Sequence, residues 1–162
     1  MIQRVVSGGQ TGVDRAALDA ALELGIPCGG WCPKGRLAED APLDARYPLA
    51  ESSSADYAQR TTWNVRDSDG TLILNRGALT GGTLQTADDA ARLRKPCLIV
   101  DLDLPLDIAA IENWIASYAI HTLNVAGPRE SKAPGIYQAA RRCLTQLFEA
   151  ASSRAARRDA AP

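Results

Sequence analysis

Residues 2–25 have the sequence IQRVVSGGQTGVDRAALDAALELG. Ile2–Val6 is a short apolar run that predicts a strand, and the glycine-rich loop Ser7–Gly12 follows it directly. From Val13 to Leu24 the apolar residues recur at helical spacing, and Gly25 stands where a helix commonly ends. A strand, a glycine loop and a helix in this order are typical of the first unit of a parallel α/β sheet.

The rest of the chain repeats this alternation. Its apolar runs are short and continuous, as in TLIL (71–74) and CLIV (97–100), which suits strands covered on both faces. We therefore predict an α/β fold, a Rossmann-like doubly wound parallel sheet of about five strands with helices on both faces. Further strands are expected at 26–30, 71–74, 97–100 and 122–126, and further helices at about 54–65, 83–93, 107–118 and 136–150. Residues 31–54 are expected to form an irregular segment, and long loops of this kind are usually functional.

Length and composition limit the possible classes. With 162 residues, the chain fits one domain, which we place at residues 1–150, with a flexible C-terminal tail at 151–162. The net charge is −1 and no apolar run approaches the roughly 20 residues of a membrane helix, so neither a nucleic-acid nor a membrane partner is expected. Four cysteines without paired spacing and one histidine predict no metal site. Reduced thiols and no secretion signal favour the cytoplasm.

The first glycine loop is a candidate phosphate cradle. Glycines let a backbone approach a phosphate closely, and the N–H groups at the start of the next helix attract anions. The loop is neither a Walker loop nor a complete dinucleotide fingerprint, so a plain tight turn is an equal alternative. The ligand-binding candidates here are Ser7, Gly8, Gly9, Gln10, Thr11 and Gly12.

Two later loops carry the same signals, also directly after predicted strands. Because parallel strands end at one edge of a sheet, the three loops are expected to face a common ligand there. Such a ligand would be small and phosphorylated, most simply a nucleotide. The second loop and the helix after it contribute Asn75, Arg76, Gly81, Gly82, Thr83 and Thr86, and the third loop contributes Gly127, Pro128, Arg129 and Ser131. A glycine-rich turn and a surface loop of mixed charge are the respective alternatives.

Charged residues near these loops supply candidate chemistry. Asp14 and Glu130 could hold Mg²⁺ or a water, and Arg129 could stabilise charge on a transferred phosphoryl group, so these three are the candidate catalytic residues. Asp14 could equally be there only to favour a helix N-terminus. Arg15, Lys34 and Arg36 are expected to add positive charge to the ligand site.

Several long motifs together resemble a known family. They are SGGQTGVDRAALDAA (7–21), GWCPKGR (30–36), RTTWNVRDSDGTLIL (60–74), GGTLQTADDA (81–90) and LNVAGPRES (123–131). These stretches resemble the molybdenum carrier proteins, which belong to the SLOG group of Rossmann-like proteins. The Lonely Guy phosphoribohydrolases are cousins in that group. The resemblance covers about residues 2–148.

This resemblance implies a homo-oligomer, a dimer or tetramer, that binds molybdenum cofactor as cargo or another phosphorylated ligand at the glycine loops. An alternative is a nucleotide phosphohydrolase that acts on ATP or ADP with Mg²⁺. A nucleotide N-glycosidase like the cousins is disfavoured, because Thr86 stands where their hydrolase motif has its glutamate.

Overall fold

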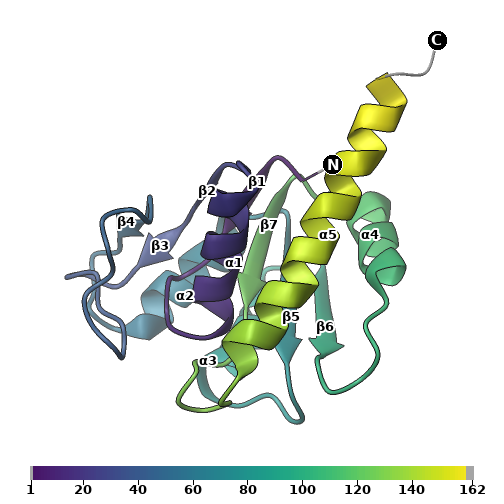
Figure 1. Cartoon of the computed structure of the whole chain (residues 1–162). Coiled ribbons are helices and arrows are strands. Elements are labelled where there is room, and N and C mark those ends of the chain that lie inside the picture. The colour runs from purple at the N-terminus through teal and green to yellow at the C-terminus, as the bar shows by residue number, and fades with distance from the viewer. Residues whose placement is uncertain (1, 160–162) are drawn as a thin grey trace.

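A parallel sheet of five strands forms the centre of the protein (Figure 1). The structure is a computed structural model that describes residues 2–159. In spatial order the strands are β2 (Cys28–Gly29), β1 (Arg4–Val6), β7 (Thr122–Ala126), β5 (Gly70–Asn75) and β6 (Cys97–Asp101). All four pairings between neighbouring strands are parallel. The predicted α/β class and the number of strands are confirmed.

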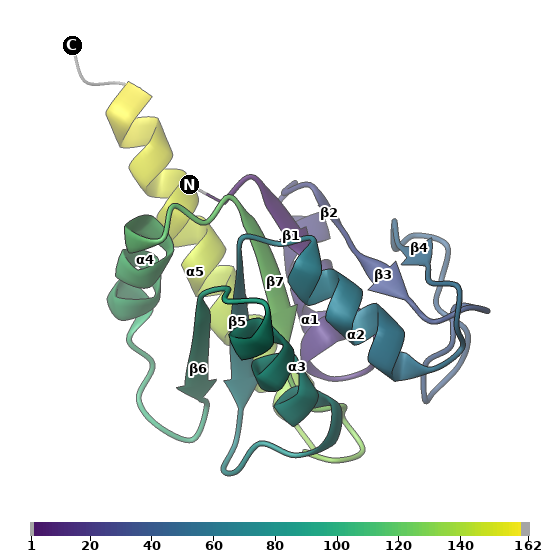
Figure 2. The same cartoon turned by 180° about the vertical axis from the view of Figure 1, so that it is seen from behind.

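Helices cover both faces of this sheet. On one face lie α1 (Val13–Glu23), α4 (Ile108–Ser117) and α5 (Ile136–Asp159), as Figure 1 shows. On the other face lie α2 (Tyr57–Arg66) and α3 (Gly81–Arg92), which pack against each other (Figure 2). The chain is therefore a doubly wound, Rossmann-like fold, as predicted.

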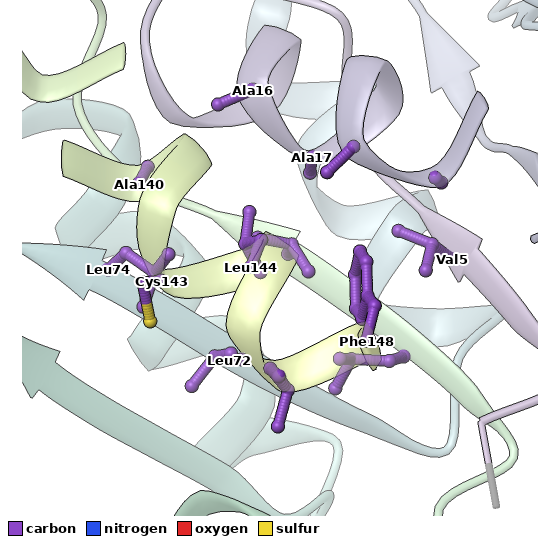
Figure 3. Close-up of a cluster of buried hydrophobic side chains, with 14 of the residues drawn as sticks. Val5, Ala16, Ala17, Leu72, Leu74, Ala140, Cys143, Leu144 and Phe148 are labelled. Atoms are coloured by element: carbon purple, nitrogen blue, oxygen red, sulfur yellow. The ribbon is translucent and has the colours of Figure 1, made fainter. Parts of the chain in front are cut away.

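The main core lies between the sheet and the helices α1, α4 and α5. Leu144 and Phe148 of α5 reach the strand side chains Val5 and Leu72, and all four are fully buried (Figure 3). The facing side of α1 is made of alanines, and such small side chains let α5 pack closely against that helix. Burying each large apolar side chain stabilises the fold by about 1.5–3 kcal/mol.

The position of β7 brings the three glycine loops together. This last strand of the sequence lies between β1 and β5, with Val6 paired to Asn124 and Ile73 to Ala126. The loops after β1, β5 and β7 therefore leave the sheet side by side at its carboxyl edge. In open α/β sheets this crevice, where the strand order reverses, is the usual place for a ligand.

Two expectations about local structure need correction. The segment 31–54 is not wholly irregular, because β3 (Trp31–Cys32) and β4 (Ala50–Glu51) form a second, two-stranded parallel sheet. The last helix does not end at Ala150 but continues to Asp159, since the alanine-rich sequence there has high helix propensity. Residues 160–162 of the predicted flexible tail lie outside the described residues. No helix among residues 2–159 is long and apolar enough to span a membrane.

One arginine organises the segment between β3 and β4. The Arg36 guanidinium donates hydrogen bonds of 2.9–3.1 Å to four backbone carbonyls, those of Leu43, Asp44, Tyr47 and Leu49. Three of these residues also belong to a small second core, which contains Leu18, Cys32, Leu43, Tyr47 and Leu49. Arg36 therefore closes the segment into a compact lobe against α1 and is not available to a ligand, contrary to the expectation from its charge.

Candidate functional site

A cavity of about 570 Å³ opens at the carboxyl edge of the sheet. Its walls come from the three predicted loops and from the N-terminal halves of α2 and α3. The cavity brings together nine of the predicted site residues, which come from all three loops. They are Gln10, Asp14, Gly81, Gly82, Thr83, Thr86, Gly127, Pro128 and Arg129.

The start of α3 forms an open backbone wall of the cavity. No side chain caps this helix, whose N-cap is Thr80. A Cβ atom added to Gly81 or Gly82 would meet nothing within 4 Å, so these glycines are not required by packing within the protein. Uncapped N–H groups and the helix dipole attract anions, and glycines allow an anion to approach the backbone closely.

A buried ion pair lies beside this wall. Arg60 of α2 donates to Asp14 of α1 at 2.9 Å, and both side chains are largely buried. Burial raises the pKa of Asp14, and the positive charge of Arg60 works against that rise. A Cβ on Gly8 would lie 1.6 Å from an Arg60 guanidinium nitrogen, so the glycine leaves room for this arginine. Arg60 thus lines the cavity with a positive charge, and its pairing with Asp14 fixes the orientation of the guanidinium group.

Two more cations, Arg129 and Lys132, and the aromatic ring of Tyr57 complete the site. The guanidinium groups of Arg60 and Arg129 lie 5.8 Å and 5.4 Å from the centre of the Tyr57 ring. Lys132 is exposed and also lines the cavity. Arginines on an aromatic face gain cation–π stabilisation and keep their other donors free for anions.

Gln10 connects the first loop to the segment between β3 and β4. Its side-chain oxygen accepts hydrogen bonds from the backbone N–H groups of Thr11 and Glu39, at 3.0 and 2.9 Å. Its Nε2 is buried and has no hydrogen-bond partner in the part of the chain whose side chains are described, residues 2–153. A buried donor without a partner costs stability, so this amide is suited to donate to a ligand or an ordered water.

Other predicted residues support the loops rather than line the cavity. The Ser7 hydroxyl donates to the Val125 carbonyl at 2.7 Å, which ties β1 to β7. Gly9 and Gly12 have positive φ, and a Cβ there would lie 2.6 Å from Leu49 and 2.4 Å from the Pro128 carbonyl. Close packing therefore explains why these two positions are glycines. The sequence alone could not distinguish this packing role from a role in phosphate binding.

The second loop is held in a similar way. The Asn75 amide donates to the carbonyls of Arg76 and Gly77, and Arg76 pairs with Asp103 at 3.1 Å. These bonds fix the turn that leads into α3. Asn75 and Arg76 therefore shape the loop without lining the cavity.

A second hollow of about 520 Å³ takes up several other candidates. It is lined in part by Thr11, Gly12, Arg15, Glu130 and Ser131. Arg15 pairs there with Asp40 at 3.1 Å. Lys34, like Arg36, lines neither hollow. The expected positive charge of these three residues is thus not part of the first cavity.

Glu130 has a structural position that its sequence context did not suggest. Its carboxylate accepts hydrogen bonds from the backbone N–H groups of Gly135 and, at 3.0 Å, Tyr137. These groups lie at the N-terminus of α5, where unpaired donors and the helix dipole stabilise a carboxylate. Glu130 therefore caps α5 instead of facing the first cavity.

None of the residues predicted for the site lies on α2, which nevertheless contributes to the cavity. Tyr57, Arg60 and Thr61 line the cavity, and Gln85 of α3 does so beside them. The helix 57–66 reads as a polar surface helix, and no local signal shows that it packs over the first loop. Only its position before the TLIL strand, within one of the motifs noted above, pointed to it.

The residues present also bear on metal binding and on the glycosidase alternative. Among the side chains that the structure describes, no group of three His, Cys, Asp or Glu residues could hold a metal ion. Thr86 stands where the cousins' glutamate is expected, and its hydroxyl donates to the Gly82 carbonyl at 2.8 Å. Thr86 therefore closes the first turn of α3 and offers no carboxylate.

Comparison with known proteins agrees with this architecture. The sequence model of the circularly permutated YpsA SLOG family matches residues 5–148. A crystal structure from Syntrophus aciditrophicus SB, named "Putative molybdenum carrier protein", is 49% identical in sequence. It superposes with a TM-score of 0.86, over 91% of this chain and 94% of that one. Among curated proteins, none matches significantly.

Proposed function

Because the chain belongs to the circularly permutated YpsA SLOG family, we propose that it binds and carries a phosphorylated small ligand in the first cavity. The cargo is molybdenum cofactor or a nucleotide. The protein acts as a carrier in the cytoplasm and assembles as a homo-oligomer.

One observation carries this proposal. A single cavity gathers Arg60, Arg129 and Lys132 around the uncapped start of α3. Arginine and lysine are the usual side-chain donors to phosphate, and a helix N-terminus adds backbone donors. The two open glycines, Gly81 and Gly82, leave room for the phosphate against the backbone.

The positions of the acidic residues favour binding over hydrolysis. Asp14 is buried and paired with Arg60, and Glu130 caps α5. Asp56 also lines the cavity, but its carboxylate accepts a hydrogen bond of 2.9 Å from Ala58 at the start of α2. None of these carboxylates is placed as a free base for an attacking water. Phosphohydrolase action with Mg²⁺ is therefore the weaker candidate.

The relative supports molybdenum cofactor as the cargo. The Syntrophus protein, which is 49% identical, carries molybdenum in its name. Molybdenum cofactor contains a pterin and a phosphate, so it would use both the cationic donors and the Tyr57 ring. A nucleotide has the same two parts, a flat ring and a phosphate.

Isothermal titration calorimetry with AMP, ADP and molybdopterin tests the proposal. We expect at least one of them to bind and to remain chemically unchanged, as checked by mass spectrometry. Lys132→Ala should weaken binding by about tenfold or more, the size of one charge-assisted hydrogen bond. Arg142→Ala is the matched control, because Arg142 is an exposed cation of α5 outside the cavity. No heat with any of the three ligands would refute the proposal, and release of phosphate would favour the hydrolase.

A further inference from the structure

The carboxylate of Glu39 lies among several hydrogen-bond donors that suit an anion, next to the cavity. Its carboxylate accepts hydrogen bonds from the Thr11 hydroxyl, from the Ser131 backbone N–H at 3.2 Å and from the Ser131 hydroxyl at 2.5 Å. Arg129 lies 3.6 Å from the same carboxylate. Hydroxyls, a backbone N–H and an arginine are the donors that proteins use for phosphate, so the chain's own carboxylate fills a site suited to an anion.

Arg129 is shared between this cluster and the cavity. The residue lines the cavity, while one of its guanidinium nitrogens pairs with Glu39. The other cavity arginine, Arg60, is paired with Asp14. Among the described side chains, those of residues 2–153, Lys132 is the cavity cation that has no carboxylate within ion-pair distance. The positive charge available to a ligand is thus much smaller than a count of cations suggests.

The geometry points to Glu39 as a residue that sets the charge selectivity of the cavity, and this inference rests on the proposed binding function. By pairing with Arg129, Glu39 lowers the attraction for ligands with more than one phosphate. A phosphate at the start of α3 is bound by Lys132 and the backbone. An additional phosphate needs Arg129 and meets the Glu39 charge beside it.

The ionisation of Glu39 supports this role. Burial opposes its charged form, but the hydrogen bonds from Ser131 and Thr11 and the nearby Arg129 outweigh that effect and hold the pKa of Glu39 below its ordinary value. The side chain is therefore negative at neutral pH. Its charge is partly exposed, so salt screens its effect on a ligand.

Glu39→Gln removes the charge and keeps a hydrogen-bonding side chain of the same size. Asp40→Asn is the matched control, because it removes a charge from the next residue, whose partner is Arg15 on the second hollow. Calorimetry with AMP and ADP at low and high salt measures the selectivity. We expect Glu39→Gln to tighten ADP binding by about two- to fivefold, the effect of one partly exposed charge, and to change AMP binding less. Asp40→Asn should leave the AMP-to-ADP ratio unchanged.

A double mutant shows whether Glu39 acts through Arg129. In an Arg129→Ala background, Glu39→Gln should no longer change the AMP-to-ADP ratio, and 0.5 M salt should shrink its effect in the wild-type background. Equal changes for AMP and ADP, weaker ADP binding, or the same result with Asp40→Asn would each overturn the inference while AMP binding by the wild type remains. If the wild type binds neither nucleotide nor molybdopterin, the proposed function fails and the inference fails with it. Thermal unfolding of each variant confirms that it is folded.

Discussion

Arg60 and Asp14 are 46 positions apart in the sequence, yet they form a 2.9 Å ion pair that joins the two faces of the sheet. Asp14 stands in the first turn of α1, and Arg60 projects from α2 on the opposite face. The pair passes over the carboxyl end of β1, directly above Gly8. It therefore fixes the distance between the first loop and α2, and with it the width of the cavity.

Gly8→Ala should disrupt this pair. The new Cβ would overlap the Arg60 guanidinium, so Arg60 must move and Asp14 is left buried without its partner. We expect a loss of about 1–3 kcal/mol in the free energy of unfolding, the cost typical of an unpaired buried polar group or an overpacked site. Urea denaturation measures this loss. An unchanged midpoint would show that Arg60 is not held over Gly8.

Gly82→Ala provides the opposite case in the same cavity. Its Cβ would meet nothing, and alanine is a better helix former than glycine, so stability should stay equal or rise by up to about 1 kcal/mol. If a phosphate sits against this backbone, the same methyl group must weaken binding of AMP or molybdopterin. Stability and affinity then change in opposite directions. Calorimetry that shows unchanged affinity would place the phosphate elsewhere.

The fold could be predicted because its signals are local. Continuous apolar runs such as those at 71–74 and 97–100 predict buried parallel strands, and Gly25 and the Asp107 cap predict helix ends. The short β3 and β4 were missed, since two residues leave no periodic pattern. The end of α5 was misplaced because a polar, alanine-rich sequence fits either a tail or an exposed helix.

The candidate site could be predicted only in part, for a similar reason. The three loops follow from parallel topology, which brings their strand ends to one edge. Arg60 contacts Asp14 although 46 positions separate them in the sequence, and Glu39 contacts Ser131 across 92 positions. No local sequence pattern encodes such contacts. Arg36 carries the positive charge that a phosphate site needs, and Glu130 carries a carboxylate that could hold Mg²⁺ or a water, but nearby backbone groups form hydrogen bonds with both side chains instead.

Arg36→Lys separates a structural role from ligand binding. The substitution keeps the charge but cannot reproduce four hydrogen bonds from one planar guanidinium. We expect a loss of about 1–3 kcal/mol in stability and faster thermolysin cleavage within residues 37–49. Arg142→Lys, on the exposed side of α5, is the control. If Arg36→Lys instead weakens AMP binding without altering cleavage, Arg36 acts on the ligand after all.

Asp69 should make stability depend on pH. Its carboxylate accepts hydrogen bonds from the backbone N–H groups of Thr122, at 2.7 Å, and His121, at 3.0 Å, and these bonds hold the pKa of Asp69 below its ordinary value. Because the folded pKa is lowered, the stabilisation is present above the unfolded pKa of about 4 and is lost as pH falls through the folded pKa.

Asp69→Asn tests this dependence. At pH 7 it should lower the free energy of unfolding by about 1 kcal/mol, a modest value because the carboxylate is exposed. The difference from wild type should shrink steadily below pH 4. Asp88→Asn, an exposed carboxylate on α3, is the control and should show no such trend. A difference that stays constant between pH 3 and pH 7 would contradict the assignment.

Glu130→Ala distinguishes the cap of α5 from a catalytic carboxylate. The substitution leaves the N–H groups of Gly135 and Tyr137 without their acceptor, so we expect a loss of about 1 kcal/mol in stability. Affinity for AMP and molybdopterin should stay within about twofold of wild type, because Glu130 lines the second hollow and not the first cavity. Urea denaturation and calorimetry on the same samples provide both values. Unchanged stability together with the loss of an ATP-cleaving activity present in the wild type would restore Glu130 as a catalytic group.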